Sequence, residues 1–206
     1  MTWRRLASLA LVLAVFCLGC DGGSSGTGIT TAEGIVASVD PATDGSLAGI
    51  RVAVEGTDIA GTTDENGFFR VQGDYDSEVT FLFTRASDQV SARLSVNVPA
   101  GGTLTMEAVR IDAARGVAVA ERQDVAFDAI IAGIDCAHDL LSLVSQQKPN
   151  DGDEYIVDLP TAQIHDPAGN EIACGALETG TRAYATANVY PDGTFGHADI
   201  VIEPSS

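Results

Sequence analysis

The sequence predicts an all-β protein: a seven-stranded β-sandwich followed by a small five-stranded antiparallel barrel-like domain. Two observations predict this class. Apolar and polar residues alternate with a period of two over short runs, as in strands with one buried face. The runs are separated by turn residues, in a chain that holds 22 glycines and 7 prolines. Residues 30–112 show no helical period, so we do not expect a helical first domain.

Composition limits the partners that the chain can have. Its 206 residues, 45% of them hydrophobic, fit one large domain or two small ones with their own cores and exclude a wholly disordered chain. Acidic residues outnumber basic ones by 29 to 11, for a net charge of −18. That charge repels phosphate backbones, so we expect no nucleic-acid partner.

Residues 1–19 have the pattern of a secretory signal peptide. Arg4 and Arg5 precede an uncharged, mostly aliphatic stretch from Leu6 to Leu18. This stretch is shorter than the roughly 20 residues that a membrane-spanning helix needs. We therefore expect cleavage, with a short membrane anchor as the alternative.

The end of this segment, Leu18-Gly19-Cys20, resembles the lipobox of bacterial lipoproteins, in which a small residue precedes the cysteine that receives the lipid. Cys17 stands three positions before that cysteine, where the family usually has leucine. The resemblance implies acyl chains such as palmitate on Cys20 and a membrane attachment in the bacterial cell envelope, with the membrane and its face left open. Residues 20–29 would then be the lipidated cysteine and a flexible Gly/Ser tether.

Two cysteines remain after the lipobox. Cys136 and Cys174 form an even pair in a chain with an export signal, and exported proteins meet an oxidising compartment. We expect a structural disulfide between them, because neither lies in a CxxC-like or zinc-ligand spacing.

The first domain, residues 30–112, is predicted from seven strand-like runs. In the sixth, four apolar side chains alternate with four polar ones, and in the last the alternation slips near Glu107-Ala108, which predicts a β-bulge. The runs are Gly34–Val39, Gly49–Glu55, Thr57–Thr62, Gly67–Val71, Glu78–Thr84, Val90–Val98 and Thr103–Ile111.

The centre of this domain resembles the carboxypeptidase regulatory-like family, whose hallmark is a strand, a Thr-Asp-x-x-Gly turn and a strand that opens with an aromatic residue. Here the turn is Thr63-Asp64-Glu-Asn-Gly67, and Phe68 or Phe69 is the aromatic residue. The resemblance implies a transthyretin-like, carbohydrate-binding-like sandwich fold without catalytic residues, used as an accessory, spacer or binding module.

The second domain, residues 113–206, is predicted from five further runs. Five strands with a disulfide between loops favour a small closed or partly closed barrel, which would leave no exposed strand edge. The runs are Val125–Ile134, Leu140–Val144, Tyr155–Leu159, Thr181–Tyr190 and Gly196–Ile202.

The last two of these runs resemble the closing hairpin of a small OB-like barrel domain of unknown function found in bacterial lipoproteins. Gly180, Asp192-Gly193, Ala198 and Ile200 fit that pattern, whereas alanines replace its usual valines. The resemblance implies a barrel whose relatives in fold bind oligonucleotides or sugars, and the net charge leaves only the sugars.

The sequence contains few features that are typical of a catalytic site. No nucleophile elbow, zinc-protease motif or P-loop is present, and the three histidines are scattered. Residues 150–154 are rich in acids but lack EF-hand spacing, so we interpret them as a turn, with a weak calcium site as the alternative. We expect no catalytic residue, no cofactor and no metal site.

These observations predict a non-catalytic, lipid-anchored envelope protein that acts as an interaction or structural module with a protein partner. The alternative is a carbohydrate-binding module for envelope or extracellular polysaccharide, for which the candidate ligand-binding residues are Tyr184, Tyr190 and Phe195 on the last hairpin. A hydrolase with paired carboxylates is the third hypothesis.

Overall fold

The computed structural model describes residues 28–41, 46–75, 77–87, 89–148 and 153–204, and it confirms the all-β class. The signal peptide, Cys20 and most of the predicted tether lie outside the described residues. The described secondary structure consists of strands and two short 3-10 helices, η1 and η2. In chain order the elements are β1 Thr30–Asp40, β2 Arg51–Val54, β3 Ala60–Thr62, β4 Phe68–Gly73, β5 Ser77–Arg85, β6 Val90–Val98, β7 Thr103–Asp112, β8 Val117–Val119, β9 Arg122–Asp135, β10 Leu140–Ser145, β11 Tyr155–Asp158, η1 Leu159–Thr161, β12 Gln163–His165, η2 Cys174–Ala176, β13 Arg182–Val189 and β14 Phe195–Ile202.

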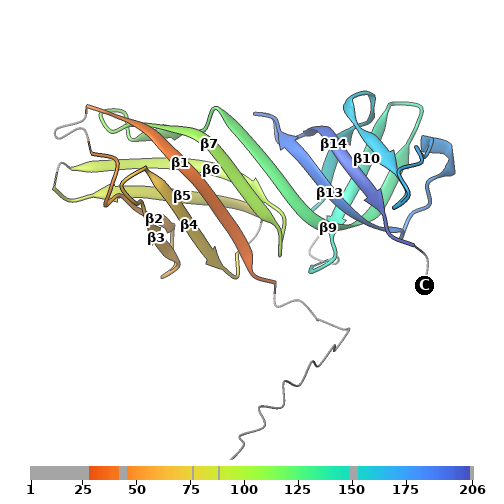
Figure 1. Cartoon of the computed structure of the whole chain (residues 1–206), viewed down its shortest axis with the longest axis horizontal. Helices are drawn as coiled ribbons and strands as arrows, with labels where there is room; N and C mark the ends of the chain where they lie inside the picture. Colours follow the sequence, from red (N-terminus) through yellow and green to blue (C-terminus); the bar gives the residue numbers. More distant parts are fainter. Residues whose placement is uncertain (1–27, 42–45, 76, 88, 149–152, 205–206) are drawn as a thin grey trace, which may run out of the picture.

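The strands form two lobes, with β1–β8 at the left of Figure 1 and β9–β14 at the right. In the first lobe β1 pairs with β4 and β7, while β5 pairs with β2 and β6. Phe69 of β4 packs edge-on against Phe83 of β5 with ring centroids 5.7 Å apart. The two sets of strands therefore face each other across an aromatic core.

The first lobe contains one element that the sequence did not reveal. The three-residue strand β8 pairs with β7 on one side and with β6 on the other, so it links the two sets of strands at one edge. The alternation of a three-residue strand is too short to stand out in a sequence. Residues 113–116 form the turn between β7 and β8.

The bulge expected near Glu107-Ala108 is confirmed. Gly34 of β1 lies opposite Met106, but Val36 lies opposite Val109, so β7 carries one extra residue there. Ala108 has a positive φ of 50°. The extra residue bends β7 and keeps Met106 and Val109 both buried.

The second lobe is a five-stranded barrel in the order β9-β10-β11-β14-β13, closed by the pairing of β13 with β9. Two pairings depart from the antiparallel expectation. Within the barrel, β11 and β14 are parallel, meeting at Val157 and Phe195, and beside it β12 also pairs with β14 in parallel. The chain reaches β13 through a long connection with η1, β12 and η2 rather than a hairpin, so β11 and β14 run in the same direction.

The predicted disulfide between Cys136 and Cys174 is present and joins the β9–β10 turn to η2. It fastens the long connection to the barrel wall. A bridge spanning 38 residues contributes about 4 kcal/mol on the chain-entropy model.

One continuous cluster of buried hydrophobic side chains extends through both lobes. The lobes are also joined by backbone pairing, because residues 103–107 of β7 pair with residues 122–126 of β9. Figure 1 shows β9 continuing from this seam into the barrel. In the barrel, Phe127, Tyr155 and Phe195 pack together, with centroids 5.3–6.1 Å apart.

Candidate functional site

The three aromatic residues predicted to bind a ligand do not come together. Tyr184 points outward from β13 with 44% of its surface exposed, whereas Phe195 is fully buried in the barrel core. Tyr190 follows the end of β13 and lines a groove beside the first lobe. Alternation along β13 explains the outward position of Tyr184, since Ala183 and Ala185 point inward. Phe195 is therefore unavailable for stacking on a ligand.

The groove that contains Tyr190 lies between the lobes and has a volume of about 260 Å³. Glu78 of β5 and Asn97 of β6 are direct cross-strand partners and form its first-lobe side together with Ser95. Gln123 of β9 and the β13–β14 turn form the rest. Neither Lys nor Arg is among the described residues that line it. The groove is therefore polar and acidic, with one aromatic ring.

Local hydrogen bonds hold the β13–β14 turn. The Asp192 carboxylate accepts hydrogen bonds from the Thr194 backbone N–H at 3.0 Å and from the Thr194 hydroxyl at 2.6 Å. The hydroxyl bond, followed by the backbone bond, lowers the pKa of Asp192 below its usual value, so the carboxylate stays charged. Gly193 has a φ of 84°, and a Cβ there would lie 3.1 Å from the Asn97 amide nitrogen. Glycine thus lets the turn approach the first lobe closely.

The Tyr190 ring is fixed against the barrel. A Cβ at Gly196 would overlap it, so the absence of a side chain at that position makes room for the ring. His197 contacts the same ring in an edge-on arrangement, with centroids 6.4 Å apart.

A second, apolar hollow lies on the outer face of β1, β4 and β7, with a volume of about 440 Å³. Ile35 and Phe68 are direct cross-strand partners, and they are 50% and 41% exposed. Ala108, at the bulge, and the acidic residues Glu33 and Glu107 also line the hollow. Large apolar side chains exposed together, with a polar rim, are typical of interaction surfaces.

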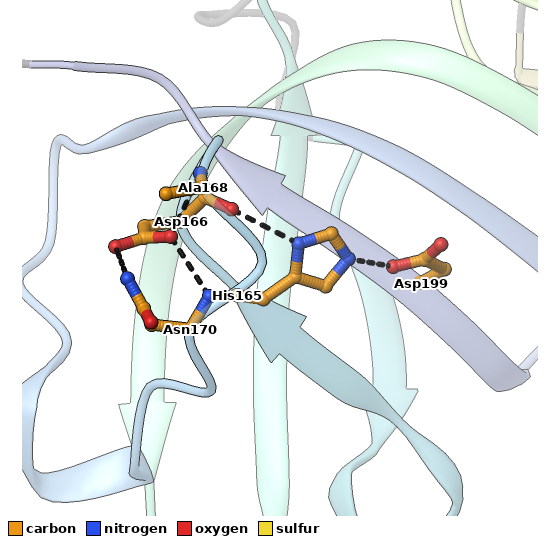
Figure 2. Close-up of polar contacts among 5 residues, drawn as sticks. All are labelled: His165, Asp166, Ala168, Asn170 and Asp199. Atoms are coloured by element: carbon orange, nitrogen blue, oxygen red, sulfur yellow. Dashed lines mark hydrogen bonds and ion pairs between the residues drawn. The ribbon is translucent and has the colours of Figure 1, made fainter.

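His165 is the centre of a polar cluster at the edge of the barrel (Figure 2). Its Nδ1 lies 3.1 Å from the backbone carbonyl oxygen of Asp166, and its Nε2 lies 2.6 Å from a carboxylate oxygen of Asp199 on β14. Both acceptors favour a protonated ring nitrogen. The Asp166 carbonyl and then the Asp199 carboxylate raise the pKa of His165 above its usual value.

The rest of this cluster is a set of hydrogen bonds within the loop that follows β12. Figure 2 shows the Asp166 carboxylate turned away from the imidazole, toward Asn170. It accepts hydrogen bonds from the Ala168 and Asn170 backbone N–H groups and from the Asn170 amide, each at 2.8–2.9 Å. Both nitrogens of His165 are engaged, so the cluster ties β12 and its following loop to β14.

The remaining sequence-based candidates can also be placed. Of the acid-rich stretch 150–154, only Asp153 and Glu154 are described, and Glu154 accepts a 2.7 Å hydrogen bond from the Ser142 hydroxyl. Within the described ranges, no group of three or more His, Cys, Asp or Glu residues is arranged to hold a metal ion. Tyr75, an aromatic residue of the first lobe that was not among those candidates, is buried, and its hydroxyl donates to the Val71 carbonyl.

Sequence reasoning missed the first-lobe side of the groove and the apolar hollow. One signal for the hollow was present: Phe68 and Phe69 are adjacent in a strand, so one ring must face outward. No comparable signal existed for Glu78 and Asn97, whose place beside Tyr190 depends on how the lobes pack.

In the part of the chain that the structure describes, no helix has both the length and the apolar character needed to cross a membrane. Comparison with known proteins adds no family: no protein-family model, curated protein or solved structure matches this chain. A function can therefore be inferred only from the geometry of the sites and from the sequence patterns.

Proposed function

We propose that this chain is a non-catalytic, lipid-anchored protein of the bacterial cell envelope that binds a protein partner through the apolar hollow around Ile35 and Phe68. Residues 1–19 are the signal peptide, and Cys20 carries the lipid. The observation that carries the binding role is the exposure of two large apolar side chains paired across β1 and β4. Burying the exposed part of each side chain against a partner would contribute about 1 kcal/mol per residue to the free energy of binding.

The architecture we propose is a regulatory-like sandwich followed by an OB-like barrel. The Thr63–Gly67 turn supports the first part, since Asp64 accepts hydrogen bonds from the backbone N–H groups of Asn66 and Phe68, at 2.8 and 2.9 Å. The strand order β9-β10-β11-β14-β13 supports the second, because a five-stranded Greek-key barrel is the OB arrangement. Fold alone does not give function, so the binding role rests on the surface.

The chemistry of the hollow defines its partner. Glu33 and Glu107 in its lining and the net charge of −18 favour a segment that is apolar in its centre and flanked by Lys or Arg. Arg70 lies 3.9 Å from Glu33, and Arg122 is the cross-strand partner of Glu107, so a cationic partner would compete with these arginines. We therefore expect binding to weaken as the salt concentration rises.

Photo-crosslinking in intact cells tests this proposal. A photoreactive residue at position 35 or 68 should give one common protein adduct. The same residue at position 119 should not, because Val119 is 56% exposed but lies on β8, outside the hollow. The isolated partner should then bind the full chain, and Phe68→Ser should weaken binding roughly tenfold, as for a central apolar contact. Absence of an adduct at both 35 and 68, or equal adducts at 119, would contradict the proposal.

The lipid anchor has its own test. Mass spectrometry of the mature chain should find acyl chains on residue 20, and Cys20→Ser should move the protein from the membrane fraction to the soluble fraction. A wild-type chain whose residue 20 carries no lipid would refute the anchor while leaving the binding role intact.

A further inference from the structure

The polar groove between the lobes is a second candidate site, independent of the apolar hollow. The hollow is formed by β1, β4 and β7, whereas the groove is formed by β5, β6, β9 and the β13–β14 turn. The two share no lining residue. Ligand binding in the groove can therefore be tested separately from the proposed protein docking.

The side chains around the groove combine two kinds of surface. Asn97 and Gln123 offer planar amides with both donors and acceptors, and Ser95 offers a hydroxyl. Glu78 and Asp192 offer acceptors only, and Tyr190 offers an aromatic ring. A sugar ring presents hydroxyl groups around its edge and C–H groups on its faces, so it matches such a set of amides, carboxylates and one ring.

The charge of the groove further limits the class of ligand that it can bind. Two carboxylates and no described Lys or Arg line the groove, in a chain of net charge −18. Phosphorylated sugars and uronic acids would be repelled. Neutral sugars and amino sugars are therefore the ligand classes compatible with the groove.

The groove is held in shape before any ligand arrives. Thr194 fixes the Asp192 carboxylate, and Gly196 and His197 fix the Tyr190 ring. A site that is already ordered loses less conformational entropy on binding. The volume of about 260 Å³ lies just below the range of roughly 300–1,000 Å³ usual for small-molecule sites. Its size suits one or two sugar units at a time.

We propose that this groove binds a short segment of a neutral or amino-sugar oligosaccharide, with Tyr190 against a face of one sugar ring and Asn97 and Gln123 hydrogen-bonded to its hydroxyl groups. The ligand contacts both lobes at once. Its binding therefore depends on β5 and β6 as much as on the barrel hairpin.

Calorimetric titration of the purified full-length chain in detergent tests the site with three probes: cellotriose, maltotriose and chitotriose. At least one should bind with a dissociation constant below about 1 mM. Asn97→Ala and Tyr190→Ala should each weaken binding at least roughly fivefold, since both remove a central contact. Tyr190→Phe should retain most of the affinity, because the ring remains.

Tyr184→Ala is the matched control, since Tyr184 lies on the same hairpin but outside the groove, and it should bind as the wild type does. Phe68→Ser should also bind the sugar normally, which separates this site from the protein-docking hollow. Failure of all three probes to bind would overturn the proposal, as would unchanged binding in Asn97→Ala. Equal loss in Tyr184→Ala would overturn the assigned location. The unfolding midpoint of each variant shows whether a loss of sugar binding is caused by misfolding. If Tyr190→Ala does not fold, the affinity of Asn97→Ala decides whether the groove binds the sugar.

Discussion

Thr63 shows how a single hydroxyl can hold a turn in place. Its side chain is 4% exposed; the hydroxyl donates to the Leu47 carbonyl at 2.6 Å and accepts from the Ile50 N–H at 2.9 Å. It thus ties the segment before β2 to the turn that leads into β4. Asp64 and Gly67 shape the rest of the turn, and a Cβ at Gly67 would overlap the Val36 carbonyl oxygen.

Thr63→Val keeps the volume of the side chain but removes both hydrogen bonds. The buried Ile50 N–H and the partly buried Leu47 carbonyl then lose a partner, so we expect the free energy of unfolding to fall by about 1–3 kcal/mol. Urea denaturation measures the change. Thr63→Ser retains the hydroxyl and should lose clearly less, and Thr62→Val, on the exposed neighbour, should lose little. A Val variant as stable as the Ser variant would show that the hydroxyl is not needed.

At the scale of elements, alternation predicted which strands exist but not how they pair. The predicted run Val90–Val98 coincides with β6, and the slip near Glu107-Ala108 is a bulge. Periodicity reports which side chains are buried, because burial is local to each strand. Periodicity does not predict the parallel β11–β14 pairing or the short strand β8, because both depend on segments that are distant in the sequence. For the same reason Tyr190 could be chosen from sequence, but its groove partners could not.

His165 of β12 contacts Asp199 of β14, the strand with which β12 pairs, so the stability that this contact contributes depends on pH. The Asp166 carbonyl and the Asp199 carboxylate raise the pKa of His165 above the value of about 6.5 that it has in an unfolded chain. A raised folded pKa contributes stability that is fully present below pH 6.5 and is lost as the pH rises through the folded pKa.

We therefore expect the wild type to lose stability relative to His165→Gln when the pH is raised from 5.5 to 8. Denaturation at several pH values measures this difference, and NMR titration of the His165 ring measures its pKa directly. In Asp199→Asn the carboxylate is absent, so the His165 pKa should fall toward its ordinary value. A wild-type His165 pKa at or below 6.5 would contradict the assignment.

At the scale of the whole molecule, the lobes are connected as one structure. The β7–β9 pairing and the shared core join them along one seam. Beside that seam, the Ser145 hydroxyl at the end of β10 donates a buried 2.6 Å hydrogen bond to the Ala100 carbonyl in the β6–β7 turn. The groove between the lobes needs this connection, because its two sides come from different lobes and a sugar would have to contact both.

The seam predicts that both lobes unfold in a single transition. Hydrogen exchange measured by mass spectrometry in increasing urea should show β6 of the first lobe and β13 of the barrel losing protection at the same concentration. Ser145→Ala leaves the Ala100 carbonyl without that donor and the Gln147 N–H without its acceptor. It should therefore lower the urea midpoint of both strands together, with a loss of about 1–3 kcal/mol in the free energy of unfolding. Ser142→Ala is the matched control on β10, because its hydroxyl bonds to Glu154 within the barrel and makes no contact across the seam. Separate midpoints for β6 and β13 in the wild type would mean that the lobes are independent. In that case the groove would be lost at the urea concentration at which the less stable lobe unfolds.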